Sequence, residues 1–455
     1  MKFTSDKQSV SKHEVPKWFH DAKFGIFIHW GLYSVPAFAV TGIDLVKSMK
    51  EKGFEGHFKE NPYAEWYLNS LRIPGSPTQE FHSKTYGENF SYDDFVSMFN
   101  EAIKKWNPKE MTSLFKKAGA KYVVLVTKHH DGFLLWPSKF PNSKKENYMA
   151  SRDIVGELTE AVKKEGMKMG FYYSGILDWS FNPNPINDVK TFLENGVQTP
   201  EYVKYANNHW YELIDRYKPI ILWNDIGYPS DTNIYEIFAY FYNKNPDGVI
   251  NDRWRQTAKG GTIHYDFITP EYQRFKKIKK KKWEATRGIG NSFGYNKFET
   301  EDDYITSEEL IRMFVDIVSK NGNLLLNVGP MANGTIPKIQ MECLIEFGKW
   351  LEVNSEAIYG TRPWEYAEGK TMDNIEIRYT QTQEALYIFL LNQIKGDQVI
   401  IHSLKIEKNS KVQILGQEKS LDWRQEGENL IIFIPENLED FPVYTFKIIP
   451  KPRYF

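Results

Sequence analysis

Short apolar runs that end on polar or aromatic residues recur along the first three-quarters of this chain. Most of these runs are separated by stretches with helical periodicity, and this alternation of strand and helix predicts a parallel sheet. The runs lead into residues 29–30, 128–131, 172–174, 224–225, 251–254, 269–271 and Asn327. In a (β/α)₈ barrel the active site forms at the C-terminal ends of the parallel strands. The repeated placement therefore predicts an α/β enzyme with a (β/α)₈-like barrel.

The segments between the apolar runs include several that are typical of helices. Helices are predicted over 111–118, 153–165, 202–217, 233–242, 307–318 and 337–353. Ser307 is the predicted N-cap of its helix, because two glutamates follow it in the first turn. Two long connections, 37–61 and 182–200, are predicted to build the rim of the site, as long loops commonly do in barrel enzymes.

The pattern changes after Trp364. Short strands separated by turn-like stretches are predicted over 375–379, 385–389, 399–402, 430–433 and 443–446. No helical pattern of comparable length appears among them, which favours a small antiparallel β-sandwich. The predicted domains are therefore a barrel over 1–361 and a β-sandwich over 362–455.

Composition excludes several classes of protein. The chain has 455 residues and a net charge of −1, which gives no reason to expect nucleic acid as a partner. It has one cysteine, Cys343, so no disulfide can form within the chain, and Cys343 is predicted to be a core residue. No apolar run is long enough to span a membrane, and the polar N-terminus lacks a signal peptide. We expect a cytoplasmic protein. The sequence leaves the oligomeric state open, a homo-oligomer included.

Two carboxyl groups can be assigned to the cleavage of a glycosidic bond. That reaction needs one carboxylate as nucleophile or base and one carboxyl as proton donor. Asp225 ends an apolar run and is the candidate nucleophile. Glu271, at the end of a later run, is the candidate acid/base, and Glu284 is its competitor.

Two further polar clusters need interpretation. His129 and His130 could bind a metal only if the strand ends there, and no cysteine lies nearby. Bonding to sugar hydroxyls is favoured, and a structural pair with one ring packed and the other exposed is the alternative. The absence of H-E-x-x-H argues against zinc, that of a glycine-rich phosphate loop against a nucleotide cofactor, and that of G-x-S-x-G against a serine hydrolase. No metal or other cofactor is expected. The lysine-rich run 276–282 is predicted to be a solvated loop.

Several of these segments together resemble the α-L-fucosidases of glycoside hydrolase family twenty-nine. The resemblance is carried by KFGIFIHWG at 23–31, TKHHDGF at 127–133, LWND at 222–225, NDRW at 251–254 and SKNGNLLLNVGP at 319–330. The matches run in order from about Trp18 to Trp364, and the β-rich tail fits the second domain of the family. So many unbroken matches, in order along the chain, are not explained by chance similarity.

The resemblance implies a retaining enzyme that removes terminal α-linked L-fucose from glycans or glycosides, on a barrel that is often irregular beside the regular eightfold form. It implies Asp225 as nucleophile and Glu271, in DFITPEY at 266–272, as acid/base. It also implies a set of substrate-binding residues: His29, Glu65, Trp66, His129, His130, Tyr172, Trp223, Arg253 and Phe293. The DFITPEY segment is similar to that of bacterial members with broad specificity, which implies tolerance of simple aryl fucosides. The preferred linkage stays open.

Two alternatives belong to other classes. One is a fucose-binding protein on an inactive barrel, which would be expected to lack one of the two carboxylates. The other is a metal-dependent hydrolase that uses His129 and His130.

Overall fold

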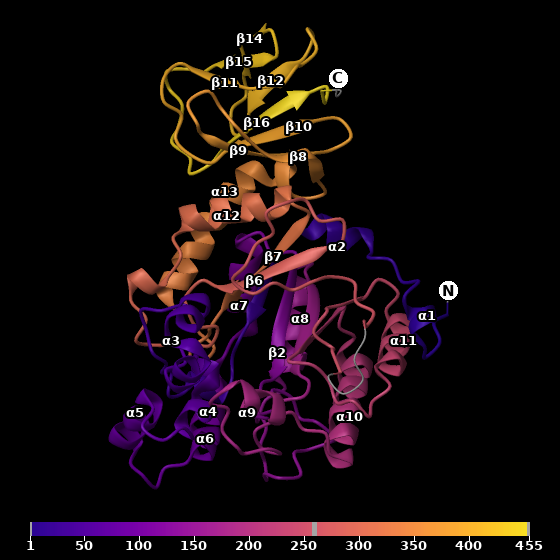
Figure 1. The fold of residues 1–455 in the computed structure, drawn as a ribbon, viewed down its shortest axis with the longest axis vertical. Helices are drawn as coiled ribbons and strands as arrows, with labels where there is room; N and C mark the ends of the chain where they lie inside the picture. The colour runs from indigo at the N-terminus through magenta and orange to yellow at the C-terminus, as the bar shows by residue number, and fades with distance from the viewer. Residues whose placement is uncertain (1, 257–261, 453–455) are drawn as a thin grey trace.

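A parallel sheet of seven strands forms the centre of the computed structural model, which describes residues 2–256 and 262–452. The strands are hydrogen-bonded in the order β5-β4-β3-β2-β1-β7-β6. Their bounds are β1 Phe24–Ile28, β2 Tyr122–Lys128, β3 Lys168–Ser174, β4 Ile221–Asp225, β5 Val249–Ile250, β6 Trp283–Gly288 and β7 Gly322–Val328. This confirms the predicted (β/α)₈-like class, in an irregular form (Figure 1).

The two edges of the sheet, β5 and β6, are joined by a segment that is not a regular strand. Isolated parallel bridges pair Asn251 with Phe267, Ile268 with Trp283, and Glu271 with Thr286. Residues 267–271 therefore occupy the eighth position of the barrel, and we call them the bridging segment. Its backbone N–H groups still find partners, because Ile268 donates to the carbonyl of Lys282 at 3.1 Å.

The helices that follow the strands are those predicted, with shifted ends. They are α7 Pro108–Lys117, α8 Ile154–Lys164, α10 Pro200–Tyr217, α11 Ile234–Lys244, α12 Ser307–Ser319 and α13 Lys338–Ile358. The predicted N-cap of α12 was wrong by one residue. Thr306 is the N-cap, because its hydroxyl accepts from the backbone N–H of Glu309 while the Glu309 carboxylate accepts from Thr306.

Further helices lie outside this alternation. They are α1 Lys7–Val10, α2 Lys17–Ala22, α3 Leu45–Lys59, α4 Tyr67–Leu71, α5 Pro77–Tyr86, α6 Phe95–Ala102 and α9 Val189–Glu194. Helices α3 to α6 lie in the connection between β1 and β2, and α9 lies in the connection between β3 and β4. The two predicted long connections thus contain a helix each, which the sequence did not predict.

A close approach inside the barrel depends on Gly25. A side-chain carbon at this position would lie 2.3 Å from the ring of Tyr122, so only glycine leaves room for that ring. Tyr122 is buried in a cluster of apolar side chains that fills the barrel interior. Its hydroxyl donates a hydrogen bond to Glu284, which places this glutamate inside the barrel core.

The C-terminal strands form two antiparallel sheets, as predicted. Sheet orders are β13-β12-β16-β10-β9-β8 and β11-β15-β14. The strands are β8 Arg362–Lys370, β9 Glu376–Gln381, β10 Leu386–Leu390, β11 Gln398–Ile401, β12 Lys411–Ile414, β13 Ser420–Leu421, β14 Trp423–Glu426, β15 Asn429–Phe433 and β16 Tyr444–Ile449. Both sheets contribute to one hydrophobic cluster, as the layers of a sandwich do. The proposed division of the chain at 361/362 falls between α13 and β8.

The C-terminal sheets pack against α12 and α13 (Figure 1). Arg378 of β9 donates to Asp316 of α12 at 2.6 Å, and Trp350 of α13 donates to the carbonyl of Val443 at 3.0 Å. Because these contacts lie on the far side of α12 and α13 from the barrel strands, the sheets support the barrel without entering its C-terminal end.

Burial confirms one prediction from composition and corrects another. Cys343 is buried in α13, as predicted. Lys282 is buried with 1% of its surface exposed, so the prediction of a solvated loop was wrong for the last residue of the lysine run. Lys282 directly precedes β6 and enters the sheet with it.

Among the described residues, no helix is long and apolar enough to cross a membrane.

His13 ties the N-terminal segment to Asp266, the residue before the bridging segment. Its Nδ1 lies 2.9 Å from Asp266 Oδ1, and its Nε2 lies 3.2 Å from the carbonyl oxygen of Pro246. Both partners are acceptors, so the doubly protonated ring fits this environment. Burial opposes that charge, but the hydrogen bond and the charge of Asp266 outweigh it and raise the pKa of His13.

We expect the stabilisation by His13 to be lost at high pH. A raised folded-state pKa contributes stability that is fully present below the unfolded pKa and is lost as pH rises through the folded value. His13→Gln should therefore lower Tm more at about pH 5.5 than at about pH 9, by roughly 1–3 °C. The measurement is thermal unfolding at both pH values, with the exposed His402→Gln as control. An equal loss of Tm at both pH values would contradict a charged His13.

Candidate active site

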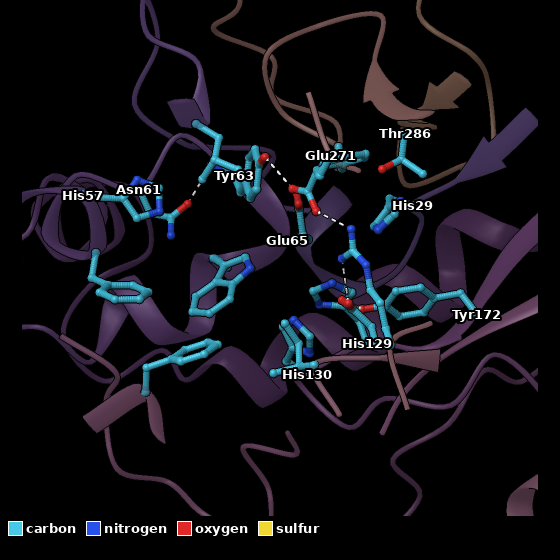
Figure 2. Close-up of a pocket in the computed structure, with 18 of the residues that line it drawn as sticks. His29, His57, Asn61, Tyr63, Glu65, His129, His130, Tyr172, Glu271 and Thr286 are labelled. Atoms are coloured by element: carbon cyan, nitrogen blue, oxygen red, sulfur yellow. Dashed lines mark hydrogen bonds and ion pairs between the residues drawn. The ribbon is translucent and has the colours of Figure 1, made fainter. Parts of the chain in front are cut away.

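One pocket at the C-terminal end of the barrel gathers all the predicted site residues (Figure 2). Those that line it are Asp225, Glu271, His29, Glu65, Trp66, His129, His130, Tyr172, Trp223, Arg253 and Phe293. The cavity measures about 190 Å³. This volume covers the whole lining and is below the roughly 300–1,000 Å³ of sites for drug-sized ligands, so the pocket suits a small ligand.

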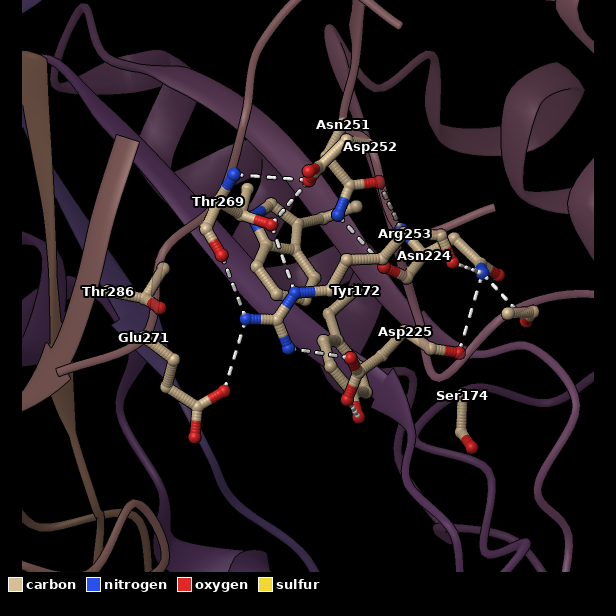
Figure 3. Close-up of polar contacts among 12 residues, drawn as sticks. Tyr172, Ser174, Asn224, Asp225, Asn251, Asp252, Arg253, Thr269, Glu271 and Thr286 are labelled. Atoms are coloured by element: carbon tan, nitrogen blue, oxygen red, sulfur yellow. Dashed lines mark hydrogen bonds and ion pairs between the residues drawn. The ribbon is translucent and has the colours of Figure 1, made fainter. Parts of the chain in front are cut away.

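Arg253 holds the two candidate carboxylates together (Figure 3). Its Nη1 donates to Asp225 Oδ1 at 2.9 Å, and its Nη2 donates to Glu271 Oε2 at 3.1 Å. Asp225 is the last residue of β4, Arg253 follows β5, and Glu271 ends the bridging segment. Three neighbouring positions of the barrel thus bring the three side chains to one point.

Asp225 is held in its ionised form. Burial alone would raise its pKa, but the charge of Arg253 and hydrogen bonds from Arg253 and Tyr172 lower it below the usual value. The Tyr172 hydroxyl donates to Asp225 Oδ2 at 2.8 Å. Each carboxylate oxygen therefore accepts one hydrogen bond, and an ionised carboxylate with a fixed orientation is what a nucleophile requires.

The guanidinium of Arg253 is fixed on its other sides. Its Nε donates to Thr269 Oγ1 at 2.9 Å, and Thr269 in turn donates to Asp252 Oδ1 at 2.7 Å. The guanidinium also lies 4.7 Å from the centroid of the Trp223 ring, which favours the cation. These contacts use the planar shape of arginine, which lysine lacks.

Replacing Arg253 should therefore change the pH profile. In Arg253→Lys a point charge can reach only one carboxylate, so the pKa of Asp225 should rise and the acidic limb of kcat/KM should move to higher pH. We expect kcat/KM to fall by at least about tenfold, the value of one charge-assisted hydrogen bond. The measurement is kcat/KM from about pH 3 to pH 9. Arg274→Lys, outside the pocket, is the control, and an unmoved acidic limb would contradict this role of Arg253.

Glu284 does not reach the pocket. It is fully buried in β6, where its carboxyl accepts hydrogen bonds from the Tyr122 hydroxyl and from Trp223 Nε1. Burial raises the pKa of Glu284 to about 7. Its position beneath Trp223 makes it a support for the pocket wall, and of the two candidates for the acid/base only Glu271 lines the cavity.

The histidines of the pocket are neutral, because burial lowers the pKa of His29 to about 4 and that of His130 to about 3. His29 Nδ1 lies 2.7 Å from Asn327 Oδ1, whose amide nitrogen donates to the carbonyl of Phe293. His130 Nδ1 lies 2.6 Å from Ser174 Oγ, and the Ser174 hydroxyl donates its hydrogen bond to the carbonyl of Leu177. Both rings must therefore carry their proton on Nδ1, which leaves Nε2 as an acceptor for a ligand hydroxyl.

His129 differs from these two rings. Its Nδ1 is buried and has no hydrogen-bond partner among the described residues. The metal interpretation of His129 and His130 gains no third ligand. Within residues 2–256 and 262–452, the side chains close enough to share an ion are His13, His264 and Asp266, outside the pocket.

Glu65 is the second buried acid of the pocket. Burial raises the pKa of Glu65 to about 8, although the backbone N–H of Gly294 donates to Glu65 Oε2 at 2.7 Å. A protonated Glu65 can donate one hydrogen bond and accept others. Together with the histidine acceptors, it gives the pocket both kinds of partner that a polyhydroxylated ring needs.

Sequence reasoning missed several residues that line the pocket. Tyr63 donates to Glu271 Oε1 at 2.9 Å, so Glu271 is held on both oxygens. Tyr63 precedes Glu65 by two residues, and an aromatic residue in the same loop was the available signal. Six of the other missed residues are apolar and come from α3 and α9: Leu45, Met49, Phe54, Phe58, Val189 and Phe192.

A pair of carboxyl groups in a small pocket at the strand ends of a barrel is the arrangement of a glycoside hydrolase. The family model described as alpha-L-fucosidase matches residues 1–356, and the alpha-L-fucosidase C-terminal domain matches 371–449. The tissue alpha-L-fucosidase of Mus musculus is 34% identical over 445 residues, covering 96% of this chain and 91% of its own.

A second relative and a solved structure agree with this match. The alpha-L-fucosidase of Dictyostelium discoideum is 34% identical over 96% of this chain and 92% of its own. The structure of Thermotoga maritima alpha-fucosidase with a mechanism-based inhibitor has a TM-score of 0.89 and 43% identity, covering 98% of this chain and 100% of its own. The chain therefore belongs to the alpha-L-fucosidase family of glycoside hydrolases.

Proposed function

We propose that this alpha-L-fucosidase is a retaining exo-enzyme that releases terminal α-linked L-fucose by double displacement. The observation that carries the proposal is the sharing of one guanidinium by Asp225 and Glu271. A single arginine can contact both carboxylates only if they are close. Retaining glycosidases keep their two carboxyl groups about 5–5.5 Å apart, whereas inverting enzymes need a wider gap for water.

In the first step, Asp225 attacks the anomeric carbon, and a glycosyl ester forms as the bond to the leaving oxygen breaks. Glu271 gives its proton to that oxygen, so the aglycone leaves as a neutral alcohol. In the second step, Glu271 takes a proton from water as the water attacks the ester. Fucose is released with its original anomeric configuration, and Asp225 returns as the carboxylate.

The remaining residues suit the shape of fucose. The ring has three hydroxyls and one methyl group, and the Nε2 atoms of His29 and His130 and the carboxyl of Glu65 can bond the hydroxyls. The ring centroids of Phe293 and His29 are 4.9 Å apart, and Phe293 offers an apolar wall for the methyl group. Thermotoga maritima alpha-fucosidase, 43% identical to this chain, has a structure in complex with fucose.

The test is a panel of three aryl glycosides: the α-L-fucoside, the β-L-fucoside and the α-D-galactoside, each with a chelator present. We expect release from the α-L-fucoside alone, with α-L-fucose as the first product by NMR. A first product of β configuration would contradict retention. Binding of fucose without turnover of any substrate would instead support an inactive, fucose-binding barrel.

A further inference from the structure

The pocket has a second, apolar part that the proposed mechanism does not use. Its lining comes from two helices outside the barrel, α3 and α9, which contribute Leu45, Met49, Phe54, Phe58, Val189 and Phe192. Phe54 has 52% of its surface exposed, and Val189 has 43%. Large apolar side chains exposed together next to a polar sugar site indicate a contact surface for a ligand.

The conformation of Gly53 brings these side chains to one cavity. Leu45 and Met49 share a helix face, and so do Phe54 and Phe58, because residues four apart lie above one another. At 100° per residue, Phe54 would lie about 180° away from Leu45 on a regular helix. Gly53 interrupts the helix with φ of 67°, a value that favours glycine, and all four side chains line the same pocket.

Helix α9 packs beside α3 in this part of the pocket. The ring of Phe192 stacks on that of Phe58 with centroids 6.2 Å apart, and Phe58 lies 5.7 Å from Trp66. Trp66 in turn lies 5.3 Å from His130. A continuous row of rings therefore leads from the polar end of the pocket to the apolar end. Figure 2 shows His57 and Asn61 at that outer end, away from His29 and Tyr172.

The polar groups of the outer part are few, and two of their atoms already have partners. His57 Nδ1 lies 3.0 Å from Ser48 Oγ, and Asn61 Oδ1 accepts from the backbone N–H of Tyr63 at 2.9 Å. A second sugar would lose its hydration here and find few hydrogen bonds in return, which is unfavourable. An alkyl or aryl group has no hydrogen bonds to water to lose, and it would bury apolar area.

We propose that α3 and α9 form a leaving-group subsite that selects apolar aglycones, so that alkyl and aryl α-L-fucosides are the preferred substrates. This proposal rests on the proposed function, because the aglycone must project outward from the carbon between Asp225 and Glu271. It assigns specificity to side chains that lie outside the barrel, on the two connections that join β1 to β2 and β3 to β4.

The experiment compares kcat/KM for methyl and n-hexyl α-L-fucosides. The two leaving alcohols have similar acidity, so the ratio of hexyl to methyl reports contact with the aglycone rather than leaving-group chemistry. Each buried methylene is worth about fourfold at full burial, so we expect a ratio of at least about tenfold for the native chain. Phe54→Ser and Phe192→Ser should each lower the ratio by at least about threefold.

Leu193→Ser is the matched control. Leu193 is also on α9 and is 67% exposed, but it does not line the pocket, so both activities and their ratio should persist. Gly53→Ala gives a second test, because alanine strains the conformation at φ of 67° and should lower the ratio without removing an apolar ring. Thermal unfolding identifies any variant that fails to fold.

The outcomes separate the two proposals. Hydrolysis of methyl α-L-fucoside with a hexyl-to-methyl ratio near one would overturn the subsite and leave the fucosidase mechanism standing. A high ratio that survives both phenylalanine substitutions would also overturn the subsite. Failure to hydrolyse either fucoside would overturn both proposals.

Discussion

Asp225→Gly should reduce the hydrolysis of an aryl α-L-fucoside on the order of 10⁴-fold or more, as in other enzymes that lose a group central to covalent catalysis. The substitution removes the carboxylate that we propose attacks the anomeric carbon, and it leaves space beside Arg253 and Tyr172. Added azide should fill that space, attack the same carbon and restore turnover, with β-L-fucosyl azide as the product. The measurement is the rate of aryl alcohol release with and without azide, and NMR of the sugar product.

Asp231→Gly is the control for this prediction. Asp231 is exposed and lies six residues beyond Asp225. Its removal should leave the rate near that of the native chain and insensitive to azide. An Asp225→Gly variant that keeps its activity without azide would refute Asp225 as the nucleophile.

Glu271→Gln should reduce kcat/KM by about 10²–10⁴-fold for an alkyl fucoside, the range typical of a lost general acid. Glutamine cannot protonate the leaving oxygen. An aryl fucoside needs less protonation, so its first step should lose less. Azide needs no general base, so it should accelerate the second step on the aryl substrate and give α-L-fucosyl azide.

Glu284→Gln is the matched comparison. Glutamine can still accept from Trp223 Nε1, and residue 284 does not line the pocket, so we expect a loss of less than about tenfold. A larger loss for Glu284→Gln than for Glu271→Gln, with α-L-fucosyl azide formed only by the former, would reverse the assignment of the acid/base.

Much of the barrel could be predicted from local sequence, because its strands are apolar and its helices periodic. Helix α8 begins at Ile154 with Asp153 as N-cap, close to the predicted start. Short strands with polar residues could not be predicted in the same way. The strand Trp423–Glu426 alternates partly exposed and exposed residues and has little apolar pattern, so only its pairing with β15 makes it a strand.

The site was predictable where its residues occur in contiguous motifs, and less so where contacts span the chain. All eleven predicted residues line one pocket, but their catalytic and binding roles stay predictions. Tyr63 and Glu271 are 208 residues apart in the sequence, and no local pattern predicts such a contact. The apolar wall from α3 depends on the backbone of Gly53, and sequence periodicity alone would have placed Phe54 on the opposite face from Leu45.

The two proposed catalytic carboxyls lie on backbone segments of different regularity, and this difference bears on how the family can diverge. Asp225 ends a strand that is paired on both sides, where a slip of one residue would turn every side chain to the wrong face. Glu271 ends the bridging segment, which isolated bridges join to its neighbours. Insertions between β5 and β6 can therefore move the proposed proton donor along the chain while the barrel persists. Among distant relatives, the nucleophile should be easy to align, and its partner should have to be found in three dimensions.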